Sequence, residues 1–377
     1  MLLLATKVWE QRKLGTITDT YSGGTPQVSV KDYYSNNEIP FIRSSDIHKN
    51  KTELYISSKG LENSSAKLVS KGHILYALYG ATSGEVDVSK IDGAINQAVL
   101  CINAHNDLNY FLMLFLSKNK DKIVRKYIQG GQGNLSASII KKIKVFTTSK
   151  LEETKISNLV KILSDIIALY DRKTKLIKQI QSSFLDCFFS ETNNVTSLNH
   201  FLRIRNGYAF KSSELTENGE IPVVKISNIG SNKPFTFTTK AKSKEQFTLY
   251  PNDIIIALSG ATAGKINQVA NKYPLYYQNQ RVGFFEIKND RLNCEYLNSF
   301  LHSKKFKSQL QKTLVAGAQP NITPKDIEKI KIPFLEYELQ QTIGQVNKYL
   351  FELQRINKDK LTLLNKIKKT LLNNMFV

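Results

Sequence analysis

Short apolar runs separated by turn residues fill the first part of the chain. Ile39–Ile42 and Ile74–Leu78 are two such runs, and Gly23-Gly24-Thr25-Pro26 and Gly80 interrupt the pattern. Runs of this length bounded by glycine and proline predict β-strands. A longer segment without glycine or proline, Leu108–Gln129, predicts a helix. The pattern therefore indicates a domain of mixed α and β structure.

The same pattern returns in the second half of the chain. Its counterparts are strands at Ile221–Ile226 and Ile254–Leu258 and a helix at Cys294–Val315. "GHILYALYGATSGE" from Gly72 aligns with "NDIIIALSGATAGK" from Asn252 at an offset of 180, and Asn134–Val145 aligns with Asn321–Ile332 at 187. This period is too long for a solenoid, so the sequence predicts two tandem copies of one domain-sized unit.

A long segment with helical periodicity follows each copy, and its apolar residues recur in alternating steps of four and three. We expect the helix-pairing residues to be Leu159, Leu163, Ile166, Ile177 and Ile180 in the first segment and Val346, Leu350, Leu353, Leu364 and Ile367 in the second. The row of residues that would face the other helix, the seam, is interrupted by polar residues in both segments. They are Lys173 in the first segment and Asn357 and Lys360 in the second. This spacing is typical of coiled coils and predicts that the two helices pair antiparallel. The alternative is that each helix lies on its own domain.

Positive charge is distributed over both copies. The chain carries 53 basic and 32 acidic residues, a net charge of +21. Residues 1–150 have a net charge of +8 and residues 191–334 of +9, so the excess does not come from a tail. Such a distribution is expected of a protein that binds a polyanion, above all nucleic acid. The alternative is a general bias toward lysine that keeps the protein soluble.

Cysteine content and hydropathy indicate a cytoplasmic protein. The three cysteines form no CxxC pair and no zinc spacing, which suits a reducing compartment. No apolar run reaches the length of a membrane-spanning helix, so we expect no membrane partner.

Motifs that resemble catalytic sites are incomplete. The segment Gly260-Ala-Thr-Ala-Gly264-Lys265 has three residues between its glycines, whereas a phosphate-binding P-loop needs four, and Ile266 stands where Ser or Thr would bind magnesium. A tight turn explains the glycines better. Asp253, Glu286 and Lys288 imitate a nuclease triplet, but the first copy has His73 in place of the Asp. We expect no catalytic residues and no metal site in this chain.

Loop side chains with base-reading chemistry are the strongest functional candidates, because Arg pairs with guanine and Asn or Gln with adenine through two hydrogen bonds. The copies differ in these residues, as two readers of different sequences would. In copy one the candidates are Thr25, Arg43, Ser44, Ser45, Tyr79, Thr82, Gln97 and Gln132. In copy two they are Arg203, Arg205, Tyr208, Lys211, Lys225, Ser227, Asn228, Ser259, Thr262, Gln280, Arg281 and Gln319. Four of them, Arg203, Arg205, Tyr208 and Lys211, are expected in the first loop of copy two.

Several segments, in order and in both copies, resemble the specificity subunit of type I restriction–modification systems. In copy one they are "WEQRKLGTI" from Trp9, "SGGTP" from Ser22, "IPFIRSSDI" from Ile39 and "QGNLSASIIKKIKV" from Gln132. In copy two they are "NGYAFKSSE" from Asn206 and "QPNITPKDIEKIKIP" from Gln319. The resemblance covers essentially the whole chain. It departs in copy one, whose first loop is rich in glycine rather than arginine.

The resemblance implies an α+β fold with two target recognition domains, residues 1–149 and 191–335, each followed by a long helix, residues 150–190 and 336–377. Each domain would read one half of a bipartite sequence in double-stranded DNA. The paired helices would set the spacer and dock two methyltransferase subunits, and two restriction subunits would complete the complex. S-adenosylmethionine, ATP and magnesium would belong to those partners, leaving this chain without a cofactor of its own.

Two other classes of function stay open on the sequence. One class is a nuclease or ATPase in its own right. The incomplete P-loop at Gly260–Lys265 and the acidic residues Asp253 and Glu286 are its support, and cleavage by the isolated chain would favour it. A coiled-coil interaction protein would show no sequence preference. The base-reading hypothesis predicts that Arg205→Ala or Arg281→Ala costs about 1–3 kcal/mol of DNA binding if the arginine contacts a base through two hydrogen bonds.

Overall fold

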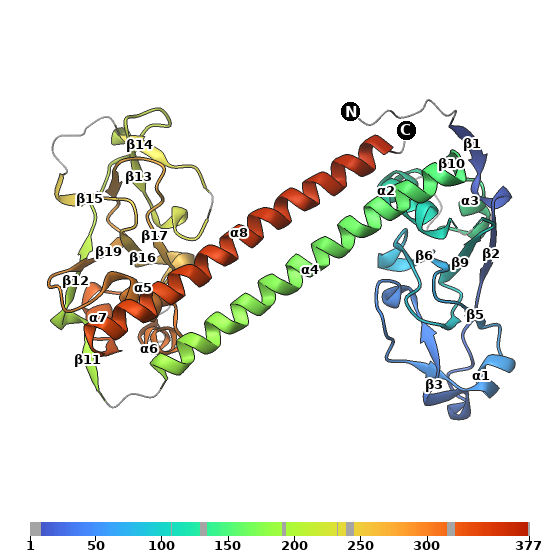
Figure 1. Ribbon diagram of the computed structural model, residues 1–377, viewed down its shortest axis with the longest axis horizontal. Coiled ribbons are helices and arrows are strands. Elements are labelled where there is room, and N and C mark those ends of the chain that lie inside the picture. Colours follow the sequence, from blue (N-terminus) through green and yellow to red (C-terminus); the bar gives the residue numbers. More distant parts are fainter. Residues whose placement is uncertain are drawn as a thin grey trace. The chain divides into compact units, whose positions relative to one another are not determined.

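The computed structural model describes residues 9–106, 108–128, 134–190, 194–231, 233–238, 245–314 and 321–375 (Figure 1). The chain forms two compact units. Unit 1 comprises residues 1–170 and 361–377, and unit 2 comprises residues 171–360. Each unit therefore contains one of the two sequence repeats together with parts of both long helices.

Unit 1 is built on two four-stranded sheets and a two-stranded ribbon. The first sheet has the order β2 (Thr18–Ser22), β9 (Val99–Ala104), β6 (Ile74–Ala77) and β7 (Val86–Val88), all antiparallel. The second has the order β4 (Tyr55–Ile56), β3 (Tyr34–Ile42), β8 (Gly93–Ile95) and β5 (Lys67–Val69), with β3 and β8 parallel. The ribbon pairs β1 (Glu10–Lys13) with β10 (Lys144–Thr147).

Unit 2 repeats this topology strand for strand. Its sheets have the orders β12 (Leu202–Asn206), β19 (Val282–Ile287), β16 (Ile254–Ala257), β17 (Ile266–Gln268) and β14 (Thr236–Thr238), β13 (Ile221–Val224), β18 (Tyr276–Gln278), β15 (Thr248–Leu249). Strands β13 and β18 are again parallel, and β11 (Val195–Ser197) again pairs with β20 (Lys331–Pro333). The prediction of two copies of one mixed α and β domain is confirmed.

Helices cover the first sheet of each unit. In unit 1 these are α2 (Asn109–Ile128) and α3 (Ala137–Lys141), whereas α1 (Ser58–Glu62) packs against β3 and β4 of the second sheet. Unit 2 has α5 (Cys294–His302), α6 (Lys304–Leu314) and α7 (Pro324–Glu328). In unit 1 the core joins Tyr76 of β6 to Phe111 and Leu116 of α2, all fully buried. In unit 2, Tyr296 and Phe300 of α5 are buried in the same way.

The prediction of one continuous helix over Cys294–Val315 is wrong, because the helix breaks at Ser303. This residue has extended backbone (φ −70°, ψ 158°) and is 1% exposed. Its hydroxyl donates to the carbonyl of Phe300 at 2.6 Å and accepts from the N–H of Phe306 at 3.2 Å. The side chain thus satisfies backbone groups at the end of α5 and the start of α6, as a cap does.

The repeated Gly-Ala-Thr segments are turns of β-hairpins. Gly80–Thr82 and Gly260–Thr262 are short 3₁₀ turns that lead from β6 to β7 and from β16 to β17. Gly84 and Gly264 have φ of +83° and +80°, and a Cβ on either would lie 2.6 Å from Val124 or 2.9 Å from Leu310. The interpretation of both segments as tight turns is therefore confirmed.

Two long helices, α4 (Lys150–Phe189) and α8 (Tyr337–Met375), run antiparallel and pack together (Figure 1). In unit 2 a buried hydrogen bond joins Gln181 to Asn347. The helix ends also enter the domain cores. Leu185 and Phe189 of α4 belong to the core of unit 2, and Leu372 and Met375 of α8 pack against the core of unit 1. The predicted pairing is confirmed, and each helix lies on the domains as well.

The predicted seam is displaced by one residue at every second position. Leu163, Ile177, Leu350 and Leu364 do face inward, but the other six predicted residues, Leu159, Ile166, Ile180, Val346, Leu353 and Ile367, are between 36% and 49% exposed. Their C-terminal neighbours take the inward places, including Val160, Gln181 and Asn347. Lys173 and Lys360 are exposed, whereas Asn357 is buried. Because apolar residues occupy both the seam and the adjacent row, hydropathy alone selected the wrong row.

Candidate nucleic-acid interface

The first loop of copy one is pressed against the end of β8. A Cβ on Gly23 would lie 1.8 Å from the carbonyl oxygen of Ile95, so the backbone approaches closely only without a side chain. This contact brings Thr25 to Gln97, and the hydroxyl of Thr25 donates to Oε1 of Gln97 at 2.7 Å. Both side chains are exposed. Two predicted DNA-binding residues that lie far apart in the sequence thus form one exposed polar pair.

Arg43 precedes a 3₁₀ turn, Ser44–Asp46, that holds its side chain. Nε of Arg43 lies 3.4 Å from Oδ2 of Asp46, and Lys49 contacts the other carboxylate oxygen at 2.8 Å. Burial alone would raise the pKa of Asp46, but hydrogen bonds from Lys49 and from the Arg43 backbone hold it below its usual value. Asp46 is therefore a charged anchor for Arg43, a role the sequence did not indicate. Ser44 is half-buried and Ser45 is exposed.

The hairpin turn of copy one exposes one aromatic side chain. Tyr79 is 37% exposed at the start of the turn, while Thr82 is half-buried and its hydroxyl donates to the carbonyl of Tyr79 at 3.5 Å. Just after the turn, Glu85 is bound by Lys120 and by His48. Tyr79 is thus available for contact, whereas Thr82 is engaged locally.

The two arginines predicted in the first loop of copy two lie instead on strand β12. Arg203 pairs with Glu286 of the neighbouring strand β19, and this hydrogen bond holds the pKa of Glu286 below its usual value. The guanidinium of Arg205 donates to the carbonyl of Thr248 at 2.7 Å and lies 4.8 Å from the ring centre of Phe284. The loop placement was wrong because strand β12 extends to Asn206. Arg205 is largely committed to contacts inside its own domain.

Aromatic rings surround the true first loop of copy two. Tyr208 packs edge-on against Phe210, with ring centres 4.9 Å apart, and tilted against Phe247 at 5.7 Å. Phe210 in turn lies 6.2 Å from Tyr277 of β18. Lys211 follows this group and is exposed. The loop thus presents a cation beside a rigid aromatic cluster.

Asn228 is buried, and its side-chain amide is engaged within its own domain. Its Oδ1 accepts the N–H of Lys225 at 2.9 Å, and its Nδ2 donates to the carbonyls of Lys233 and Pro234, each at 3.2 Å. The amide therefore shapes the turn that carries Lys225 and Ser227, both half-buried. Asn228 occupies the position that Asp46 occupies in copy one. An asparagine can stabilise this turn or pair with adenine, so the residue type alone does not distinguish the two roles.

The remaining candidates of copy two differ in accessibility. Ser259 is 8% exposed, and its hydroxyl has no hydrogen-bond partner among the described residues. Thr262 donates weakly to the carbonyl of Ile226 at 3.4 Å. Gln280 and Arg281 are exposed on the segment between β18 and β19. Gln132 and Gln319 lie outside the described residues.

The nuclease-like residues of copy two do not form an independent acidic site. Glu286 is bound by Arg203 and lies 3.8 Å from Arg205. Asp253 accepts the N–H of Tyr250 at 2.8 Å, and burial raises its pKa. Across the described part of the chain, no group of three or more His, Cys, Asp or Glu side chains is placed to hold a metal ion. No helix of that part is long and apolar enough to span a membrane.

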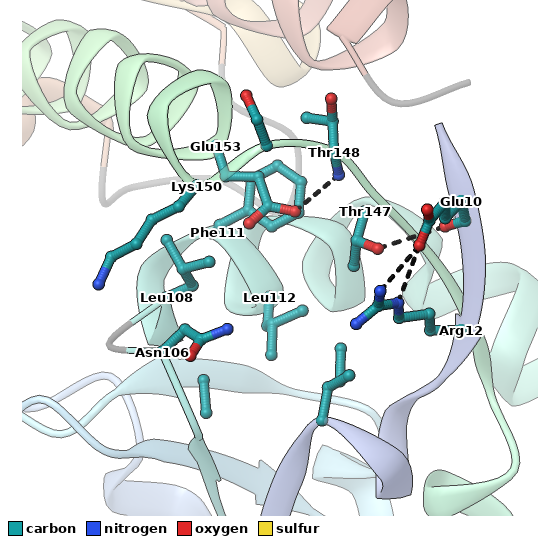
Figure 2. Close-up of a pocket in the computed structure, with 13 residues that line it drawn as sticks. Glu10, Arg12, Asn106, Leu108, Phe111, Leu112, Thr147, Thr148, Lys150 and Glu153 are labelled. Carbon is teal, nitrogen blue, oxygen red and sulfur yellow. Dashed lines mark hydrogen bonds and ion pairs between the residues drawn. The ribbon is translucent and has the colours of Figure 1, made fainter. Parts of the chain in front are cut away.

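A cavity of about 360 Å³ lies in unit 1 between β1, α2 and the start of α4 (Figure 2). Arg12 and Glu10 form an exposed ion pair at its edge, with nitrogen and oxygen 2.8 Å apart. Glu153 is 3% exposed, and its carboxylate accepts the N–H of Thr148 at 2.9 Å. Burial raises the pKa of Glu153 above its ordinary value. In unit 2 the corresponding residue is Gln340, whose amide makes three hydrogen bonds, to Asn293, Arg291 and Leu335.

Comparison with known proteins identifies the family. The model of the type I restriction modification DNA specificity domain matches the chain twice, over residues 6–182 and 190–368. The chain belongs to this family of DNA specificity proteins. Within it, the chain is 25% identical over 405 residues to the type I restriction enzyme MjaVIII specificity subunit of Methanocaldococcus jannaschii, covering 97% of this chain and 91% of that protein. It is also 23% identical over 255 residues to the type I restriction enzyme MjaIX specificity subunit of the same organism, covering 59% of this chain and 58% of that protein.

Solved structures have the same fold. The S subunit of the type I restriction–modification system of M. genitalium superposes with a TM-score of 0.71 at 16% identity, covering 100% of this chain and 98% of that one. A chain from a study of complex assembly and conformational transition of the type I restriction–modification system gives a TM-score of 0.54 at 15% identity, covering 100% and 99%. The fold predicted by the resemblance, two tandem domains with paired long helices, is confirmed.

Proposed function

We propose that each copy of the repeat reads one half of a bipartite DNA sequence for a type I restriction–modification enzyme. The observation that carries this proposal is that two units with the same strand order present different side chains at equivalent loops. Thr25 and Arg43 of copy one correspond to Ala209 and Lys225 of copy two. Since base edges are read by side-chain donors and acceptors, equivalent positions with different chemistry suit two different half-sites.

The charge of the chain supports DNA as the ligand. Both copies carry a positive excess, +8 over residues 1–150 and +9 over residues 191–334. Basic surfaces supply the sequence-independent part of DNA binding, while loop side chains supply the discrimination. In this proposal residues 1–149 and 191–335 are the reading domains, and 150–190 and 336–377 are the helices that set the length of the unread spacer.

An exposed apolar row on each long helix supports docking of methyltransferase subunits. On α4 the row contains Leu159, Ile162, Ile166, Leu169, Leu176 and Ile180. On α8 it contains Leu339, Val346, Tyr349, Leu353, Ile356, Leu363 and Ile367. Each of these residues immediately precedes an inward-facing position, so each row lies beside the buried face of its helix.

The two rows are expected to share one side of the helix pair. Successive residues turn by about 100° around a helix. In an antiparallel pair, a residue that precedes the seam by one position points to the same side on both helices. Exposed apolar surface of this kind marks an interaction site. An amphipathic helix from a partner, laid along these rows, would complete a four-helix arrangement.

The catalytic groups belong to the partners in this proposal. Two methyltransferase subunits would bring S-adenosylmethionine and modify adenine, and two restriction subunits would use ATP and magnesium in the cytoplasm. The nuclease or ATPase alternative gains no support from the comparisons, and Glu286 is held by arginine rather than arranged to bind metal.

Genome-wide mapping of methylated adenine, with and without the gene, tests the proposal. We expect deletion to remove methylation from one split motif and to leave all other motifs methylated. Restoring the gene in trans should restore the same motif. Retention of every motif on deletion, in cells whose partner methyltransferase is expressed, would contradict the proposed function.

Docking is tested by a charge placed in the apolar row of α8. Leu353 is 44% exposed, so Leu353→Glu should fold, but it should greatly reduce co-purification of the methyltransferase subunit. Arg355→Glu is the matched control, because Arg355 follows a seam position and lies on the other side of the helix. Equal co-purification with both variants would show that the partner docks elsewhere.

A further inference from the structure

An apolar cavity of about 480 Å³ opens beside the exposed polar residues of copy one. It is lined by Thr25, Val28, Lys31, Tyr34, Phe41, Arg43, Leu54 and Asn96. Two of these, Thr25 and Arg43, are DNA-binding candidates, and Gln97, a third candidate, is bonded to Thr25. Three residues singled out separately in the sequence therefore meet at one place.

The guanidinium of Arg43 lies at the edge of this cavity and is held there by Asp46. Its Nε contacts Asp46, whose side chain is 1% exposed and is itself held by Lys49. Among the described residues, no hydrogen bond engages the two terminal nitrogens of Arg43. The side chain of Arg43 is 43% exposed. A guanidinium held through Nε presents its other edge for a ligand with two adjacent acceptors.

The wall of the cavity offers apolar contact next to this cation. Val28 is 75% exposed, a high value for a β-branched apolar side chain, and Phe41 forms the buried floor. A phosphate would gain little from such a wall, because a charged group loses hydration against apolar surface. The major-groove edge of a base pair combines both kinds of group, since guanine presents two acceptors and thymine a methyl group.

The equivalent place in copy two has a different character. Lys225 replaces Arg43, neutral Asn228 replaces Asp46, and Ala209 replaces Thr25. Tyr208, Phe210, Phe247 and Tyr277 pack against one another beside it. The charged anchor and the open apolar wall are thus features of copy one, as expected of residues that distinguish one half-site from the other.

We infer that this cavity is the base-reading pocket of copy one, in which Arg43 donates to N7 and O6 of a guanine while Val28 contacts the methyl group of a neighbouring thymine. The inference rests on the proposed function and specifies it. It predicts that the half-site read by copy one contains a guanine with an adjacent thymine on either strand. Asp46 acts as a positioning residue, because it holds the guanidinium without touching DNA.

The experiment uses the assembled complex of this chain with its methyltransferase subunits, and a duplex carrying the motif found by methylation mapping. We expect Arg43→Ala to weaken binding roughly 5- to 150-fold, the range of a lost bidentate contact, and to relax selectivity at one guanine of one half-site. Arg43→Lys should restore overall affinity without restoring that selectivity. Lys225→Ala is the control, because it should alter only the other half-site.

Modified DNA tests the same contacts without changing the protein. Replacing the critical thymine by deoxyuridine removes only its methyl group and should weaken binding about 4-fold, the value of one buried carbon. Replacing the critical guanine by 7-deazaguanine removes one acceptor. The wild-type complex should respond to both changes, whereas Val28→Ser should respond to 7-deazaguanine alone.

Two results would overturn the inference. One is a uniform loss of affinity in Arg43→Ala for all sequences, with unchanged selectivity, which would assign Arg43 to a phosphate. The other is a half-site of copy one without guanine. Either result would leave the proposed function standing, because the wild-type complex would still methylate its split motif. Absence of any motif dependent on the gene would instead contradict the proposed function itself.

Discussion

The side chains of Gln181 and Asn347 are hydrogen-bonded inside the helix pair of unit 2, with Nε2 of Gln181 2.8 Å from Oδ1 of Asn347. Asn347 also donates to the hydroxyl of Ser299 at 3.0 Å, and Gln354 donates to Gln181 at 2.7 Å. In unit 1 the position that corresponds to Asn347 is Val160, which is also buried. At this position the junction of helices and domain is polar in one half of the chain and apolar in the other.

Asn347→Ala should destabilise unit 2 more than an ordinary surface change would. The substitution leaves Nε2 of Gln181 without its acceptor and removes the hydrogen bond that the hydroxyl of Ser299 accepts, and an unsatisfied buried group costs about 1–3 kcal/mol. Thermal unfolding followed by circular dichroism should show a lower midpoint for this variant. Gln345→Ala, at an exposed position of the same helix, should leave the midpoint unchanged. Equal midpoints for the two variants would mean that the network does not contribute to stability.

Glu153→Gln should stabilise unit 1 at neutral and alkaline pH. Burial raises the pKa of Glu153 above 4.5, so folding favours the protonated carboxyl. The stability that this proton supplies is fully present below pH 4.5 and is lost as pH rises through the folded value. A glutamine stays neutral throughout and can bond as Gln340 does in unit 2. We expect a gain on the order of 1 kcal/mol at pH 8 and no gain at pH 4, measured by chemical denaturation.

The reverse change in unit 2 is the matched control for Glu153. Gln340→Glu places a carboxylate where two carbonyl oxygens now accept from an amide, so it should destabilise the protein and do so more strongly as pH rises. If Glu153→Gln were equally stabilising at pH 4 and pH 8, the effect would not come from the proton on Glu153.

Arg205→Ala and Arg281→Ala should separate structural from recognition roles. Arg205 donates to Thr248 and stacks on Phe284, so its loss should lower the unfolding temperature as well as DNA affinity. Arg281 is exposed, and Arg281→Ala should leave the unfolding temperature unchanged. If Arg281 contacts a base, its removal should cost about 1–3 kcal/mol of binding at one position of the half-site. Thermal unfolding and binding isotherms on the same preparations distinguish the two roles.

Lengthening both long helices by one heptad should lengthen the spacer of the target. Seven residues inserted after Arg172 in α4 and after Asp359 in α8 add about 10 Å to each helix and keep the seam in phase. At about 3.4 Å per base pair this corresponds to about 3 base pairs. Methylation mapping should show unchanged half-sites separated by a longer spacer. Changed half-sites with the original spacer would contradict the role of the helices in setting the distance.

The sequence predicted the domain repeat, the hairpin turns and the helix pair, because each depends on local signals that recur at constant offsets. Gly80 and Gly84 indicate a tight turn in any context, and their counterparts Gly260 and Gly264 repeat it. The helix seam was displaced because Leu159 and Val160 are both apolar, and hydropathy does not tell which of them a partner covers. The break at Ser303 was missed because serine also occurs inside helices, and its capping bonds exist only in the folded chain.

The candidate site was harder to predict, because side-chain chemistry does not reveal whether a residue is engaged within the protein. Asn228 and Arg205 have the right groups for bases, yet both make hydrogen bonds inside unit 2. Asp46 and Val28 were overlooked for the opposite reason. An acidic residue and an aliphatic one do not suggest DNA binding until the fold places them beside Arg43. Long-range pairing thus decides which polar residues remain available.

The ribbons β1–β10 and β11–β20 place the entrance and exit of each domain side by side. A gene segment exchanged between Lys13 and Lys144, or between Ser197 and Lys331, would replace a whole reading surface at one junction. The long helices and their exposed apolar rows would keep their sequence. Under the proposed function, a lineage would therefore acquire a new DNA target by recombination in a single step, and the surface proposed for methyltransferase docking would stay unaltered.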